Sequence, residues 1–92
     1  MNLKDKVAVV TGGARDIGRA ISIKLAQEGA KVVVNYFESE SDGNATVEAI
    51  EKAGGTAIAV YADATKQADI DNLVAKTKDT FGEQLDILVN VA

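Results

Sequence analysis

The sequence predicts an α/β protein in which four parallel strands alternate with three helices. Four short apolar runs are separated by stretches whose apolar residues recur at helical spacing. Glycines stand where the expected helices end, and the chain contains no proline. Strands and helices that alternate in this way are typical of βαβ units, in which each helix connects two parallel strands.

The first half of the chain holds two expected strands and one helix. Residues 7–10 form a continuous apolar run, which indicates a strand buried on both faces. The first helix is expected over 17–28, because Ile17 begins a row of apolar residues four apart and a glycine stands at the C-cap position. Residues 31–36 are expected to form a second buried strand.

The second half repeats the pattern. Residues 39–42 offer N-cap candidates for a helix that a pair of glycines closes, and 56–61 form a third apolar run. Thr65 can cap a third helix, and 85–89 form a fourth strand. The right-handed crossover rule then favours a Rossmann-type three-layer fold, with a partial parallel sheet of four strands in the order 3-2-1-4.

The fourth apolar run has the composition of an interior strand, whose outer edge and faces require cover. The sequence supplies no further segment after it. We therefore expect residues 1–92 to be the first part of a longer fold.

The composition excludes several classes of protein. The 92 residues include 10 basic and 14 acidic side chains, a net charge of -4, which argues against binding to nucleic acid. The absence of Cys and His excludes disulfides, thiol or imidazole catalysis and an ordinary zinc site. Neither a membrane-spanning run nor a signal-peptide pattern is present. We expect a cytoplasmic protein without metal, nucleic acid or membrane partners.

Residues 11–18 (Thr-Gly-Gly-Ala-Arg-Asp-Ile-Gly) connect the first strand to the first helix. A glycine turn at a helix N-terminus binds phosphate, because free N–H groups and the helix dipole point at the anion. Gly12 allows the sharp turn, and Gly18 allows the helix to pack closely on the strand. A purely structural turn is the alternative.

Three motifs resemble those of the short-chain dehydrogenases/reductases, most closely the 3-oxoacyl-[acyl-carrier-protein] reductase group. They are Val-Thr-Gly-x-x-x-x-Ile-Gly-Arg-Ala at 10–20, Ala-Asp at 62–63 and Asp-Ile-Leu-Val-Asn-x-Ala at 86–92. The resemblance implies that residues 1–92 are the N-terminal dinucleotide-binding part of such a domain. It also implies reduction of a carbonyl by hydride transfer, on a β-ketoacyl thioester of the kind used in fatty acid biosynthesis.

The resemblance assigns roles to individual residues. The turn from Gly12 to Gly18 would bind the pyrophosphate, and Asn90 would lie beside the nicotinamide ribose. Asp63 would accept a hydrogen bond from the adenine amino group, with the Ala64 N–H alongside. Two structural alternatives stay open: Asp63 can begin an Asx turn, and Asn90 can satisfy backbone groups of the loop.

Asp16 departs from the family pattern, which has glycine at this position. A carboxylate there suits the helix dipole but repels a nearby phosphate. It could cap the helix when no ligand is bound, or turn outward so that only its N–H faces the cofactor.

The residues around the end of the second strand favour NADP over NAD. Tyr36 follows Asn35 and occupies the place where NAD-specific members carry an acid, while the Arg15 guanidinium suits a 2′-phosphate. Arg15 could instead be a solvated residue, and Glu38 is a rival that could serve NAD. The predicted cofactor-binding residues are Gly12, Arg15, Asp16, Ile17, Gly18, Asn35, Tyr36, Asp63, Ala64 and Asn90.

The chemistry of the family uses a Tyr-x-x-x-Lys pair with a Ser, in which the Tyr donates a proton. Tyr36 is followed four residues later by Glu40, and Tyr61 by Thr65, so we expect no catalytic residue in this chain and no activity from it alone. A homo-oligomer is expected. The competing hypothesis is a non-catalytic Rossmann module that binds nucleotide weakly or only self-associates. A phospho-acceptor domain is disfavoured, because no acidic pair follows the first strand.

Overall fold

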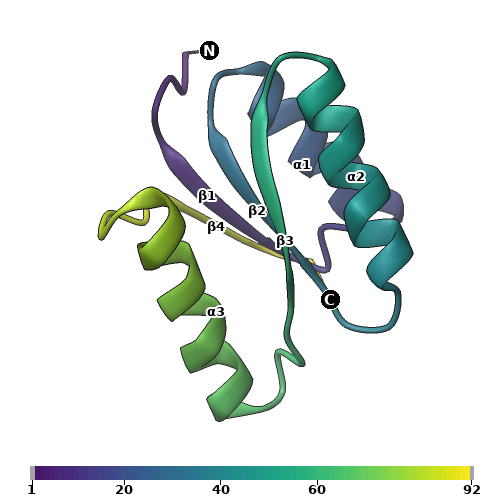
Figure 1. Ribbon diagram of the computed structural model, residues 1–92, viewed down its shortest axis with the longest axis vertical. Helices are drawn as coiled ribbons and strands as arrows, with labels where there is room; N and C mark the ends of the chain where they lie inside the picture. The colour runs from purple at the N-terminus through teal and green to yellow at the C-terminus, as the bar shows by residue number, and fades with distance from the viewer. Residues whose placement is uncertain (1, 92) are drawn as a thin grey trace.

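The computed structural model describes residues 2–91, in which strands and helices alternate along the whole length. Every element expected from the sequence is present (Figure 1). In chain order they are β1 (Val7–Thr11), α1 (Asp16–Gln27), β2 (Lys31–Tyr36), α2 (Glu40–Lys52), β3 (Thr56–Tyr61), α3 (Gln67–Phe81) and β4 (Ile87–Asn90).

The four strands form one parallel sheet in the order β3-β2-β1-β4, which confirms the predicted topology. Thr11 at the end of β1 pairs with Asn90 at the end of β4, and Tyr36 at the end of β2 pairs with Tyr61 at the end of β3. The carboxyl ends of all four strands therefore meet at one edge of the sheet. Loops that follow this edge form the ligand-binding crevice in open α/β sheets.

The sheet lies between two helical layers, with α1 and α2 on one face and α3 on the other (Figure 1). Val10, Val32 and Val34 pack with Ile50 of α2 in the larger core. On the opposite face, Val9, Val33 and Val60 pack with Leu73 of α3. Residues of the central strands are buried on both faces, because each face carries a helical layer. Continuous apolar runs in β1 and β2 are the sequence signature of that burial.

The buried face of α1 agrees in part with the expected one, since Ile21 and Leu25 of the expected row pack against the core and Ile17 does not. Its buried residues are Gly18, Ser22 and Ala26, whereas Ile17 is 70% exposed. These small side chains let α1 lie close to the sheet, and Ile17 at its start lies outside the buried face. The expectation that Ile17 belongs to the apolar stripe was wrong.

Two element boundaries also differ from the expected ones. The N-cap of α3 is Lys66, which makes no side-chain capping bond, so the prediction that Thr65 caps this helix was wrong. Thr65 instead donates from its amide and its hydroxyl to Asp63 Oδ1. The last strand begins at Ile87, because the side chain of Asp86 turns back to accept a hydrogen bond from the Val7 amide at 2.8 Å. None of the helices within residues 2–91 is both long and apolar enough to cross a bilayer.

Candidate cofactor-binding site

The turn between β1 and α1 has no room for a Cβ at any of its three glycines, and at Gly13 this atom would lie 2.7 Å from the Val10 carbonyl oxygen. Gly12 has φ +64, and a Cβ there would lie 2.7 Å from the Val91 carbonyl oxygen. Gly18 faces back onto the turn, where a Cβ would collide with the carbonyl oxygen of Gly12. The missing side chains allow the first turn of α1 to press against the end of β1.

No side chain caps the N-terminus of α1. Arg15 is its N-cap residue, in extended conformation, and its side chain makes no capping bond. By contrast, Ser39 caps α2 by accepting a hydrogen bond from the Asp42 amide at 3.2 Å. The first-turn N–H groups of α1 are therefore free of a side-chain cap, at a position where an anion can accept from them.

Asp16 is the first residue of α1 and has φ +51, in the left-handed region. The suggestion that its carboxylate caps the helix is wrong for this structure, since α1 has no side-chain cap. An L residue adopts this conformation at a cost, although aspartate tolerates it better than most. The backbone thus has the conformation that glycine would adopt freely at this position.

The side chain of Asn35 connects the strand ends through hydrogen bonds, and the residue is 3% exposed. Its Oδ1 accepts a hydrogen bond from the Gly12 amide at 3.2 Å. Its Nδ2 lies within hydrogen-bond distance of the carbonyl oxygens of Tyr36, Val60 and Ala62. The side chain fixes the glycine turn to the ends of β2 and β3, while direct contact of Asn35 with a cofactor stays a prediction.

Two hollows open at the carboxyl edge of the sheet. The one beside α1 has a volume of about 480 Å³. The one beside α3 has a volume of about 710 Å³ and continues along the face of the sheet as far as Gly82 and Leu85. Both are lined by Gly12, Asn35, Phe37 and Val91, so they form one trough across the strand ends. Of the predicted site residues, Arg15, Asp16, Ile17 and Tyr36 line the first hollow, and Asp63, Ala64 and Asn90 line the second.

Asp63 lines the second hollow. It also forms the Asx turn that was the structural alternative to a cofactor-binding role. Its Oδ1 accepts from the Thr65 amide at 3.0 Å and from the Thr65 hydroxyl at 2.6 Å. These hydrogen bonds hold the pKa of the Asp63 carboxyl below its ordinary value. The Asp63 amide donates to Asp69 Oδ2 at 2.9 Å, which fixes the loop to α3.

Asn90, at the end of β4, lines the same hollow as Asp63. Its Oδ1 accepts a hydrogen bond from the Thr11 hydroxyl at 2.7 Å, and the Val91 amide donates to the Thr11 carbonyl at 3.2 Å. The side chain is exposed, so it satisfies a loop group and still faces the trough. Ala92, the last residue of the motif, lies outside the described residues.

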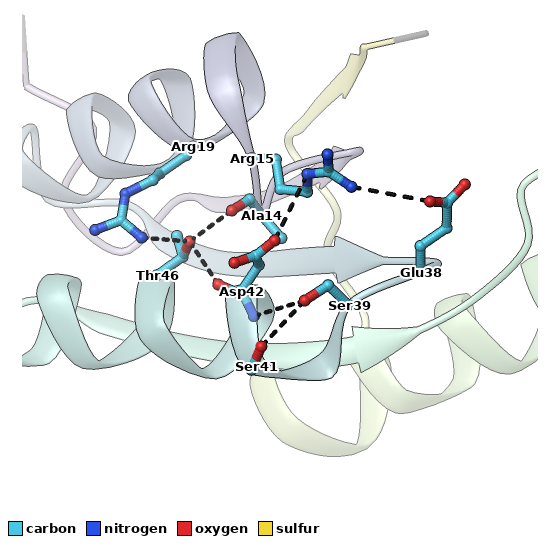
Figure 2. A network of polar contacts seen from close by, with 8 residues as sticks. All are labelled: Ala14, Arg15, Arg19, Glu38, Ser39, Ser41, Asp42 and Thr46. Atoms are coloured by element: carbon cyan, nitrogen blue, oxygen red, sulfur yellow. Dashed lines mark hydrogen bonds and ion pairs between the residues drawn. The ribbon is translucent and has the colours of Figure 1, made fainter.

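Tyr36 and Arg15 both interact with acidic side chains near the start of α2. The Tyr36 hydroxyl donates to Glu40 Oε2 at 3.2 Å, and the pKa of Tyr36 is raised by burial first and by Glu40 second. Arg15 lies between two carboxylates, with Nε 3.6 Å from Asp42 Oδ2 and NH1 3.9 Å from Glu38 Oε2 (Figure 2). Arg15 is therefore paired, not merely solvated.

Sequence reasoning missed two buried hydroxyls and one aromatic residue. Ser22 Oγ donates to the Gly13 carbonyl at 3.1 Å, and Thr46 Oγ1 lies 3.1 Å from the Ala14 carbonyl oxygen. Hydroxyl residues in the middle of helices were the available signal, because a buried hydroxyl needs a partner. Phe37, which directly follows the second strand, lines both hollows.

Comparison with known proteins identifies the family. A family profile described as short chain dehydrogenase matches residues 6–92. The chain is 48% identical over 92 residues to the short-chain dehydrogenase/reductase homolog YusS of Bacillus subtilis, covering 100% of this chain and 84% of that protein. It is 51% identical over 88 residues to an uncharacterized oxidoreductase of Methylorubrum extorquens, covering 96% of this chain and 35% of the relative.

Solved structures agree with the sequence matches. A dehydrogenase/reductase from Sinorhizobium meliloti superposes with a TM-score of 0.94 at 44% identity, covering 99% of this chain and 36% of that one. A short-chain dehydrogenase/reductase from Serratia marcescens gives 0.94 at 42% identity, covering 100% and 37%. The chain thus spans most of YusS but about a third of these longer proteins. The profile match, the identity to YusS and the shared fold together show that this chain belongs to the short-chain dehydrogenase/reductase family.

Proposed function

We propose that this chain is the dinucleotide-binding part of an NADP-dependent oxidoreductase that reduces a carbonyl to an alcohol. The observation that carries the proposal is the β1–α1 turn, where three glycines without room for a side chain bring an uncapped helix N-terminus to the end of β1. The free N–H groups of such a turn are the donors that a pyrophosphate requires.

The trough fits the remaining parts of a dinucleotide. Its two hollows share Gly12, so a pyrophosphate at the turn would lie between Arg15 in the first hollow and the groups of the second hollow. Asp63 and Ala64 supply an acceptor and an amide beside one hollow, which suits the edge of an adenine ring. Asn90 offers an exposed amide near the nicotinamide ribose. These roles of Asp63, Ala64 and Asn90 are part of the proposal.

Arg15 supports NADP over NAD, since a guanidinium binds a 2′-phosphate through paired N–H donors. Tyr36 replaces the acid that NAD-specific sites carry at the end of the second strand. The exposed Glu38 carboxylate beside Arg15 weakens this preference, because it competes with the phosphate for the same guanidinium. We therefore propose a moderate preference for NADP.

The reaction class rests on the relatives and on the family. Their names include a hydroxynaphthalene reductase-like protein, a hydroxysteroid dehydrogenase and a reductase that catalyses keto-reduction. A bound reduced nicotinamide would supply a hydride to a carbonyl carbon, and a proton donor would complete the alcohol. We propose a β-ketoacyl thioester or similar ketone as substrate, and a cytoplasmic homo-oligomer as the active form. This chain lacks the Tyr-x-x-x-Lys pair, so we expect it to bind cofactor without turnover.

Titration of the chain with NADPH and with NADH, followed by nicotinamide fluorescence, tests the proposal. We expect saturable binding of both, tighter for NADPH, and loss of that difference in Arg15→Gln. Lys52→Gln is the matched control, because it removes one positive charge at the far end of α2. Absence of binding to the unsubstituted chain would overturn the proposed function, and an NADPH preference that survives in Arg15→Gln would overturn the role of Arg15.

A second candidate function is a non-catalytic module that self-associates through β4. This strand is at the edge of the sheet, and Leu88 at its centre is 64% exposed. Leu85 and Val74 are also exposed beside the same hollow. An open strand edge with an apolar neighbour can pair with the same edge of a second copy.

A further inference from the structure

The Arg15 side chain is placed by contacts that differ in strength. The side chain is 57% exposed, and two carboxylates approach its guanidinium from different segments (Figure 2). Asp42 comes from the first turn of α2 and approaches Nε, whereas Glu38 comes from the loop before α2 and approaches NH1.

Hydrogen bonds to its backbone hold Asp42 in the first turn of α2, and Thr46 connects this turn of the helix to the glycine turn. Its amide donates to Ser39 Oγ, and its carbonyl oxygen lies 2.9 Å from the Thr46 hydroxyl. The same hydroxyl, fully buried, lies 3.1 Å from the carbonyl oxygen of Ala14, the residue before Arg15. The Thr46 hydroxyl, which donates its one hydrogen to either carbonyl oxygen, therefore keeps the first turn of α2 beside the residue that precedes Arg15.

Glu38 has no comparable anchor. Its side chain is 71% exposed and 3.9 Å from NH1, at the outer limit of an ion pair. Within residues 2–91, Arg15 is the one polar partner recorded for this carboxylate. A contact of this kind contributes little free energy, so a stronger anion can replace it.

We propose that Asp42 is a positioning residue that holds Arg15 for a 2′-phosphate, and that Glu38 is the group which this phosphate displaces. The inference rests on the proposed function and extends it to adenosine nucleotides phosphorylated at the 2′ position. With Asp42 on the Nε side, displacement of Glu38 frees the NH1 end of the guanidinium. A phosphate then accepts charge-assisted hydrogen bonds there.

The two carboxylates therefore have opposite effects, although each carries one negative charge. Glu38→Gln removes the competitor and is expected to strengthen binding of the 2′-phosphate two- to fivefold, roughly the range of an exposed ion pair. Asp42→Asn removes the group that orients Arg15 and is expected to weaken binding by a similar factor. Simple repulsion between carboxylate and phosphate predicts a gain in both variants.

Calorimetry with adenosine 2′,5′-bisphosphate and adenosine 5′-monophosphate isolates the 2′-phosphate, because the two probes differ only there. The measured quantity is the ratio of their affinities. We expect Glu38→Gln to raise this ratio, Asp42→Asn to lower it and Asp42→Glu to preserve it. Glu48→Gln is the control for charge, since Glu48 lies on α2 and pairs with Lys52 instead of Arg15. Thermal unfolding followed by circular dichroism checks that each variant folds.

The outcomes separate this inference from the proposed function. If neither probe nor NADPH binds the unsubstituted chain, both fail together. If the probes bind and both variants change the ratio in the same direction, or neither changes it, the roles of Asp42 and Glu38 are wrong while dinucleotide binding stands.

Discussion

Replacing Asp16 with glycine is expected to tighten dinucleotide binding without destabilising the protein. Asp16 lies in the first turn of α1 at φ +51, beside the amides proposed to bind the pyrophosphate. The substitution removes a negative charge from the site and replaces a residue in a left-handed conformation with one that adopts it freely.

The expected changes in affinity and in stability come from charge repulsion and from backbone strain, respectively. One pair of unit charges about 6 Å apart in water repels by about 0.7 kcal/mol, and screening at physiological salt reduces this by about half. Two phosphate charges therefore imply binding that is roughly three- to tenfold tighter, depending on salt. For stability, the left-handed conformation costs an L residue about 1–2 kcal/mol, less for aspartate, and the entropy of glycine in the unfolded chain offsets about 0.4–1 kcal/mol.

Calorimetric titration with NADPH at low and high salt measures the repulsion between Asp16 and the phosphates, and urea unfolding measures the change in stability. Asp16→Asn separates them, because asparagine removes the charge but keeps a side chain in the left-handed region. We expect both variants to gain affinity, and the glycine variant alone to gain stability through release of strain. Unchanged affinity in both variants at low salt would refute the repulsion, and a clear loss of stability in Asp16→Gly would refute the strain.

Three further predictions concern other parts of the structure. Asn35→Asp is expected to lower the free energy of unfolding in urea by about 3 kcal/mol, because a buried carboxylate would face backbone carbonyl oxygens in place of the donating amide. The control is Asn44→Asp, since Asn44 is exposed. Equal stability of the two variants would contradict the claim that Asn35 connects the glycine turn to the strand ends. Since the folded-state pKa of Asp63 is lowered, its stabilising contribution is present above its ordinary pKa and is lost as the pH falls through the folded value. Thr65→Val should raise that pKa in a carboxyl NMR titration, and an unchanged value would exclude the hydroxyl as its cause. Sedimentation should show concentration-dependent self-association that Leu88→Lys abolishes, whereas a monomer at all concentrations would exclude pairing through β4.

The sequence predicted the order and type of all elements, because the signals were repeated and local. Continuous apolar runs such as 31–36 can be buried only where helices cover both faces of a sheet, and the crossover rule then restricts the strand order. The exact buried face of α1 could not be read from spacing alone. It depends on the contact between Gly18 and Gly12, which is tertiary.

The polar contacts of the site were less predictable than its position. The glycine turn can be identified from the sequence. The partners of Asn35 come from the turn after β1, from β2 and from the end of β3, which local sequence does not indicate. Thr65 is a good N-cap residue by type, yet it bonds Asp63 instead. Likewise, nothing local indicates that Asp42 approaches Arg15 from another helix. Local propensity identified the residue types, and tertiary packing decided their partners.

The most direct test of pyrophosphate binding at the β1–α1 turn is an amide NMR titration of the labelled chain with NADPH. We predict that the amides of Gly12 and of Asp16 to Gly18 shift most, together with those of Asp63 and Ala64 across the trough. Shifts confined to α3 and β4, or none at saturating NADPH, would contradict the claim that the β1–α1 turn binds the pyrophosphate.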